Sequence, residues 1–140
     1  WNNFLCRYFH GSEEYVSLST REVVVPVLTK RVYETRERSD GFRLLVMRYW
    51  PRGIAKARVD GWEKGLAPSK ELLSALRSSE ITWQQYVGRF VCEMNSRDDS
   101  VVAIDLLRKR VRTETVTLLC WCRDYLQCHR TLLKKMIEQR

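Results

Sequence analysis

The stretch Thr115-Val-Thr-Leu-Leu-Cys-Trp121 contains an apolar block and leads, through a polar loop, into a segment that runs from about Cys128 to the end of the chain. A block of this length and composition is typical of a strand covered on both faces. The apolar residues of the final segment recur at the spacing of one helical face: Leu132, Leu133, Met136 and Ile137. Together they predict a buried strand followed by a loop and a helix.

Two further strands are predicted earlier in the chain. Val23 to Glu34 is β-branched and partly alternating, and Pro26 marks its start or an edge because proline cannot donate to a ladder. Phe42–Trp50 carries the apolar block Leu44-Leu45-Val46-Met47 and ends before Pro51. Both segments fit strands of a mainly parallel sheet.

Three helices are predicted between these strands. Ser69 after Pro68 marks the first helix entrance, and Thr82 with Gln85 forms a capping box for the second. Asp98, Asp99 or Ser100 caps the third. The expected inner face of the first helix is Leu72, Leu73 and Leu76, and that of the second is Trp83, Tyr86, Val87, Phe90, Val91 and Met94. The expected inner face of the third is Val101, Ile104, Leu107 and Val111. Strands separated by helices indicate an α/β fold, a small Rossmann-like layered domain with a mainly parallel sheet flanked by helices.

Composition sets broad limits on the function. The 140 residues are 44% hydrophobic, which excludes a disordered chain, and no apolar run approaches the about 18 residues of a membrane span. We expect an extension over 1–22 and one α/β domain over 23–140. Five cysteines cannot all pair within one chain, so a reducing cytoplasm is the expected location. The net charge of +8 favours an anionic partner.

The loop from Cys120 to Arg130 is the first candidate site. It leaves a buried strand and reaches a helix N-terminus, a position that binds anions and lowers the pKa of a thiol. One interpretation makes Cys128 a nucleophile, His129 its base and Arg130 an anion clamp; a milder one is an anion site without covalent chemistry. The alternative is packing, because Cys128 aligns with the apolar stripe of the last helix.

The second candidate is Arg48-Tyr-Trp-Pro-Arg-Gly53, at the exit of the Phe42–Trp50 strand. In a parallel sheet this exit shares an edge with the Cys120 loop, so Arg48 and Arg52 could bind one phosphate or carboxylate. In the alternative interpretation Tyr49 and Trp50 pack in the core and both arginines are solvated. The sequence leaves these two interpretations open.

Metal and cofactor binding are not predicted. Cys120, Cys122, Cys128 and His129 are close in the sequence, and Cys6 and His10 could add ligands, but no pair has the C-x₂₋₄-C spacing of common zinc sites. Cys92 points away from the apolar stripe of its helix, which suggests a possible homodimer contact.

The motifs resemble the YeaO-like family, a bacterial and archaeal family of unknown function. The resemblance covers Thr29 to Ile137 and rests on these blocks: Lys30-Arg-Val-Tyr33, Asp40-Gly-Phe-Arg-Leu-Leu-Val46, Arg48-Tyr-Trp-Pro-Arg-Gly53, Trp62 with Leu66-Ala-Pro-Ser69, Trp83 with Tyr86, and Val116-Thr-Leu-Leu119 with Asp124. It implies a small Rossmann-like α/β domain in the cytoplasm and implies no activity. Family members commonly carry Asp where this chain has Met47.

The expected function is therefore binding of an anionic small molecule at the sheet edge by Arg48, Arg52 and Arg130, with Cys128 and His129 as the candidate catalytic residues of a thiol-dependent enzyme. The alternative is a nucleic-acid-binding module that uses basic runs such as Arg108-Lys-Arg-Val-Arg112. No membrane contact is expected. Substrate and reaction are not specified by the residues.

Overall fold

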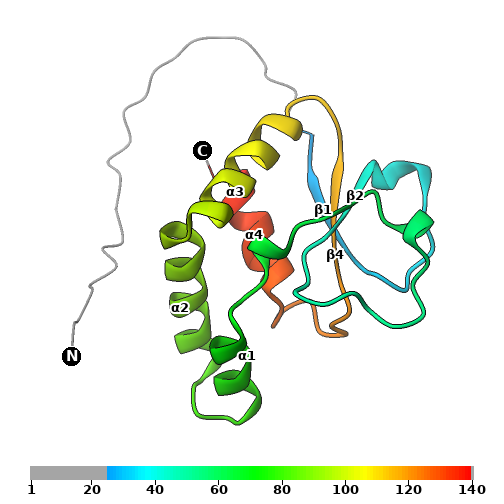
Figure 1. Ribbon diagram of the computed structural model, residues 1–140. Helices are drawn as coiled ribbons and strands as arrows, with labels where there is room; N and C mark the ends of the chain where they lie inside the picture. Colours follow the sequence, from blue (N-terminus) through cyan, green and yellow to red (C-terminus); the bar gives the residue numbers. More distant parts are fainter. Residues whose placement is uncertain (1–24, 140) are drawn as a thin grey trace, which may run out of the picture.

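The computed structural model describes residues 25–139, and its centre is a four-stranded sheet (Figure 1). The strands are β1 (Val27–Arg31), β2 (Phe42–Leu45), β3 (Gly61–Trp62) and β4 (Val116–Cys120). Their order is β1-β4-β2-β3, and every neighbouring pair is parallel. The last strand of the chain is therefore inserted between the first two, and the predicted parallel α/β architecture is confirmed.

Four helices complete the fold: α1 (Lys70–Arg77), α2 (Trp83–Ser96), α3 (Asp98–Arg110) and α4 (His129–Glu138). Ser69 caps α1 by accepting from the N–H of Leu72, and Thr82 and Gln85 form the expected capping box of α2. The predicted cap of α3 is wrong. Arg97 occupies that position, and the two aspartates lie in the first turn, where their charge favours the helix N-terminus.

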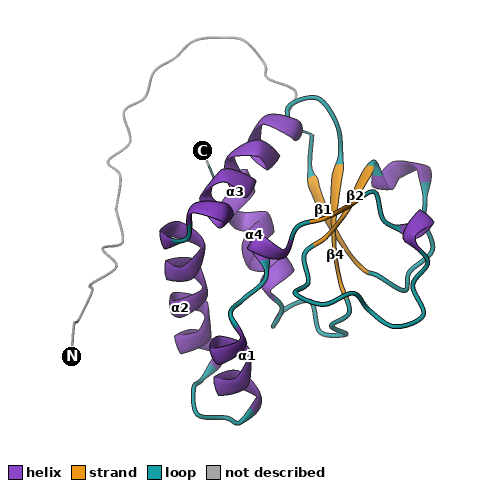
Figure 2. Cartoon of the chain, in the orientation of Figure 1, coloured by secondary structure: helices purple, strands orange, loops and turns teal. Residues whose placement is uncertain are grey.

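The four α-helices lie on one side of the sheet, as the cartoon in Figure 2 shows, and some of the short 3₁₀ turns lie on the other. The core on this side joins alternate strand residues such as Leu44 and Leu118 to the inner faces of α1–α4. The inner face of α4 is confirmed, but that of α3 is shifted: Val101 is 39% exposed, whereas Ser100, Ala103, Ile104 and Leu107 are buried. The shift follows the i, i+3, i+4, i+7 spacing that begins at Ser100.

The strands are shorter than predicted because side chains take over the backbone hydrogen bonds. After Leu45, the carbonyl of Val46 accepts from His129 and that of Met47 accepts from the indole of Trp62. These contacts turn the chain out of the sheet, so Phe42–Trp50 is not one strand. β1 begins directly after Pro26, as predicted. β3 has two residues, too few to show a periodic pattern.

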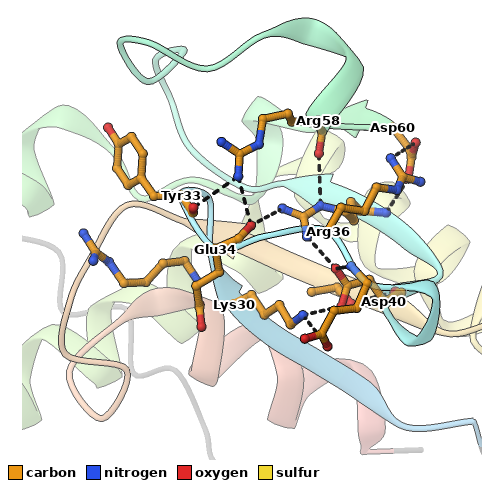
Figure 3. A network of polar contacts seen from close by, with 11 residues as sticks. Lys30, Tyr33, Glu34, Arg36, Asp40, Arg58 and Asp60 are labelled. Carbon is orange, nitrogen blue, oxygen red and sulfur yellow. Dashed lines mark hydrogen bonds and ion pairs between the residues drawn. The ribbon is translucent and has the colours of Figure 1, made fainter.

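The opposite side of the sheet holds a small apolar cluster and a buried polar network (Figure 3). Asp40 and Arg43 are both 0% exposed and form an ion pair, and Lys30 Nζ lies 2.6 Å from the other carboxylate oxygen of Asp40. Arg43 Nε also donates to the carbonyl of Arg58 at 3.0 Å. In the sequence, Asp40 stands out only as the first residue of the Asp40–Val46 block of the family resemblance, because its partners are brought to it by the sheet.

Across residues 25–139, none of the helices combines the length and the apolar character that crossing a membrane requires. The expected extension over 1–22 lies outside the described residues.

Candidate functional site

A cavity of about 180 Å³ lies at the carboxyl ends of β2 and β4. Its walls come from both strand exits, from α1 and from the first residue of α4: Met47, Arg48, Tyr49, Pro68, Leu73, Leu76, Arg77, Cys120, Trp121, Cys122 and His129. Ligands of open α/β sheets bind at this edge. The two candidate segments of the sequence, the exit of β2 and the Cys120 loop, therefore meet at one cavity.

Arg48 is held in a fixed orientation at this cavity. Its Nε and Nη2 atoms both donate to the carbonyl of Pro68, at 3.1 and 2.9 Å. Within residues 25–139, Nη1 makes no hydrogen bond. One edge of the guanidinium thus positions the side chain, and the other is available to an anion.

His129 joins the start of α4 to the end of β2. Its Nε2 lies 2.6 Å from the carbonyl of Val46 and must be the donor, because a carbonyl can only accept. Burial lowers the pKa of His129, so the ring is neutral and its proton is on Nε2. The unprotonated Nδ1 faces the sulfur of Cys128 at 3.9 Å.

The thiols of Cys120 and Cys128 lie close to this imidazole, and a third thiol, that of Cys122, lies beside Cys120. The sulfur atoms of Cys120 and Cys122 are 3.6 Å apart, as expected for residues on one face of a strand end. The ligand atoms of Cys120, Cys128 and His129 all lie within 4.8 Å of one another, and these three residues are buried. This group is the candidate metal-binding set among the described residues.

The three thiols have different acidities. Hydrogen bonds from Cys120 and Cys128, helped by the charge of Arg130, lower the pKa of Cys122 well below its usual range. The hydrogen bond with Cys122, together with burial, raises the pKa of Cys120 to about 11. Hydrogen bonds with Cys120 and Cys122, together with burial, raise the pKa of Cys128. Cys122 is also half-buried and lines the cavity, whereas Cys128 is 2% exposed. Cys122 is therefore the thiol best placed to be an accessible thiolate.

The remaining predicted residues lie apart from this cavity. Arg130 is 3% exposed, and its Nη1 donates to the carbonyls of Lys30 and Cys120 at 3.0 and 3.2 Å. Its guanidinium joins α4 to β1 and β4, and Arg130 contributes to a different hollow. Arg52 is exposed, is not among the residues that line the cavity, and accepts a hydrogen bond from Tyr33 through its carbonyl.

Sequence reasoning overlooked two cavity residues. Cys122 was considered only as a zinc ligand, although its position two residues after Cys120 places both side chains on one face. Arg77 was not singled out because it follows the apolar face of α1 as an ordinary exposed cation. Only the packing of α1 against the sheet edge brings it to the cavity.

A family model described as "Active DUF488-N3 subclade" matches residues 27–140. The chain belongs to this DUF488-N3 family. The chain is also similar to uncharacterised proteins of two bacterial groups. The uncharacterised protein YeaO of Escherichia coli K12 is 32% identical over 106 residues, which cover 74% of this chain and 90% of YeaO. The YeaO-like resemblance of the sequence is therefore confirmed.

An uncharacterised protein of Mycobacterium tuberculosis H37Rv is 34% identical over 116 residues, covering 81% of this chain and 95% of its own. A protein of Mycobacterium bovis, also uncharacterised, matches to the same extent. No solved structure matches the DUF488-N3 chain significantly. Family membership thus establishes common ancestry, and these uncharacterised relatives specify no function.

Proposed function

We propose that this protein binds a small anionic molecule, carrying a phosphate or carboxylate, in the cavity at the carboxyl ends of β2 and β4. The observation that carries the proposal is the charge of the walls: Arg48 and Arg77 line the cavity, and no Asp or Glu is among its lining residues in the described part of the chain. Two guanidinium groups without a competing carboxylate favour an anion.

The size of the cavity supports a small anionic group. A volume of about 180 Å³ is below the range of pockets that enclose drug-sized molecules. Tyr49, Leu73 and Arg77 also line an adjoining hollow of about 460 Å³, together with Lys70. The anionic group would occupy the inner cavity, and the rest of the molecule would lie over the exposed ring of Tyr49 beside a further cation.

Phosphate titration of the full chain tests this assignment. We expect orthophosphate and phenyl phosphate to shift the amide NMR signals of Cys120, Cys122 and His129. Replacing Arg77, whose side chain makes no hydrogen bond within residues 25–139, by Met should weaken binding at least about tenfold, as expected for one charge-assisted contact. Arg48→Met should weaken it similarly.

The matched control is Arg112→Met, which removes an exposed arginine remote from the cavity lining. Its phosphate affinity should equal that of the unmodified chain. Equal weakening by Arg77→Met and Arg112→Met would show diffuse attraction to a basic protein and would overturn the cavity assignment.

A thiol-dependent reaction on the bound anion is the second candidate function. The observation that favours it is the position of Cys122 in the cavity wall together with its lowered pKa. The thiolate would be the nucleophile, and Arg48 would hold the charged end of the substrate. The sequence favoured Cys128 for this role, and selective thiol labelling distinguishes the two.

Nucleic-acid binding, the alternative from the sequence, stays a prediction. Arg108 donates to the carbonyl of Met136, and Arg110 pairs with Glu114 and lies over the ring of Phe42. These two cations of the basic run already have intrachain partners. Titration with duplex and single-stranded nucleic acid at low and high salt tests the alternative, because phosphate contacts weaken steeply with salt. The homodimer and the cytoplasmic location likewise stay predictions.

A further inference from the structure

We propose that Cys120, Cys122, Cys128 and His129 form a binding site for a thiophilic divalent metal ion, with Zn²⁺ as the best fit. The site would lie at the inner end of the cavity, where β4 ends and α4 begins. It requires no anion in the cavity and so does not rest on the anion binding proposed above, but it takes Cys122 as a ligand and therefore excludes that thiolate as a nucleophile while the metal is bound.

Two distances within this group are close to those between the ligands of a tetrahedral site. With Zn–S bonds of about 2.3 Å and Zn–N bonds of about 2.0–2.1 Å, two sulfur ligands are about 3.8 Å apart and a sulfur and a nitrogen about 3.6 Å apart. The sulfur atoms of Cys120 and Cys122 are 3.6 Å apart, and Cys128 Sγ lies 3.9 Å from His129 Nδ1. Thiol–thiol hydrogen bonds alone would not require a nitrogen at the same spacing.

The imidazole is prepared for metal binding. Metal-binding histidines usually donate their other N–H to a carboxylate or a backbone carbonyl, which fixes the tautomer. His129 donates Nε2–H to the carbonyl of Val46, which directs the lone pair of Nδ1 toward the thiols. An ordinary core histidine would need no such arrangement beside three sulfur atoms.

Three of the four ligands are already gathered, and Cys122 completes the set. The ligand atoms of Cys120, Cys128 and His129 form one compact buried group. Cys122 lies beside Cys120 on the cavity side and, being half-buried, is the ligand that an ion entering from the cavity meets first. Binding would displace the protons of the three thiols, since thiolates are the ligands.

The charge of the filled site would be balanced within the fold. Three thiolates, one neutral imidazole and Zn²⁺ sum to a net charge of −1. The buried guanidinium of Arg130, which contacts the carbonyl of Cys120 and acts on Cys122 electrostatically, supplies a compensating positive charge. Charge balance explains the buried position of Arg130 beside the cluster better than anion binding does, because Arg130 Nη1 already donates to two backbone carbonyls.

Metal titration of the reduced full chain in phosphate-free buffer tests the site. We expect one Zn²⁺ per chain in competition with a chromophoric chelator. Co²⁺ should give the visible bands of tetrahedral geometry and a thiolate-to-metal charge-transfer band whose intensity corresponds to three sulfur ligands. Cys128→Ser should lower affinity more than about 100-fold, since loss of a supporting contact outside the ligand set already costs 10–100-fold.

Two further variants keep the test decisive if Cys128→Ser does not fold. Cys122→Ser changes a half-buried side chain and should reduce the charge-transfer band by one sulfur while keeping the tetrahedral bands. Cys92→Ser, in α2 and outside the lining of the cavity, should leave binding unchanged. The proposal is overturned if the unmodified chain binds neither metal, or if Cys92→Ser weakens binding as much as Cys122→Ser.

Discussion

The guanidinium of Arg43 and the carboxylate of Asp40 form an ion pair in which both side chains are fully excluded from solvent. Arg43 lies in β2 and Asp40 lies two residues before the first residue of that strand, so the pair fixes the entry of the chain into the sheet. Lys30 from β1 adds a second cation at 2.6 Å. The pair therefore holds the two strands on either side of β4 in one polar cluster.

Asp40→Ala should destabilise the protein by about 3–5 kcal/mol, because it leaves the buried charge of Arg43 without its carboxylate. Urea unfolding followed by circular dichroism measures the loss. Asp105→Ala is the control: its pair with Arg108 is largely exposed, and its removal should cost less than about 1 kcal/mol. Equal losses in the two variants would contradict a structural role for the buried pair.

Stability should fall in acid, and Asp40 should account for part of the fall. Burial opposes ionisation of this carboxyl, but hydrogen bonds from Lys30, the backbone of Glu37 and Arg43 outweigh it and hold its pKa below the usual 3.8. A lowered pKa in the folded state stabilises the protein above the usual value, and this contribution is lost as the pH falls through the lowered one.

The measurement is urea unfolding of the unmodified chain and of Asp40→Asn at pH 7 and pH 3. The unmodified chain should lose more unfolding free energy over this interval than the variant, in which the titrating group is absent. Identical losses would place the acid sensitivity elsewhere, for example at Asp60, whose pKa is also lowered.

Gly41 and Gly53 form a natural matched pair. Both have positive φ angles, +61° and +76°, so alanine is strained at either position. A Cβ at Gly41 would also lie 2.1 Å from the carbonyl oxygen of Thr115, whereas a Cβ at Gly53 meets nothing within 4 Å. Gly53→Ala should cost about 1–2 kcal/mol. Gly41→Ala should lower the free energy of unfolding clearly more than Gly53→Ala, because β2 and the entry to β4 must move apart to make room for the Cβ. Thermal unfolding of both variants measures the two losses. Equal losses would show that the close contact with Thr115 is unimportant.

Thiol labelling of metal-free protein should select Cys122. At neutral pH iodoacetamide reacts with thiolates, and Cys122 has a lowered pKa while those of Cys120 and Cys128 are raised. Peptide mass spectrometry should find Cys122 modified before the other two, with a rate that changes little between pH 6 and 9. Faster labelling of Cys128 would instead support the nucleophile predicted from the sequence. Added Zn²⁺ should protect all three thiols.

Much of the fold was predictable because its signals are local. The apolar block of β4, the stripe of α4 and the caps at Ser69 and Thr82 are each contained in a few residues. The cap of α3 was misplaced because three consecutive residues can all cap a helix, and only packing decides between them. β3 was missed because its pairing with β2 is short.

The candidate site was predictable in position but not in composition. The parallel arrangement places the ends of β2 and β4 at one edge, so Arg48 and His129 were expected close together, and both line the cavity. The metal ligands were discounted because the spacing of Cys120, Cys122 and Cys128 matches no common zinc motif. Their convergence depends on how the loop after β4 returns to α4, and spacing along the chain does not contain that information.

The central place of β4 also has a consequence for biosynthesis. β1 and β2 do not pair with each other, and each needs the same late segment, Val116–Cys120, as its neighbour. During translation the ribosome must therefore release the chain as far as Cys120 before the sheet can close. A nascent chain stopped ahead of this strand would expose two unsatisfied strand edges to chaperones and proteases.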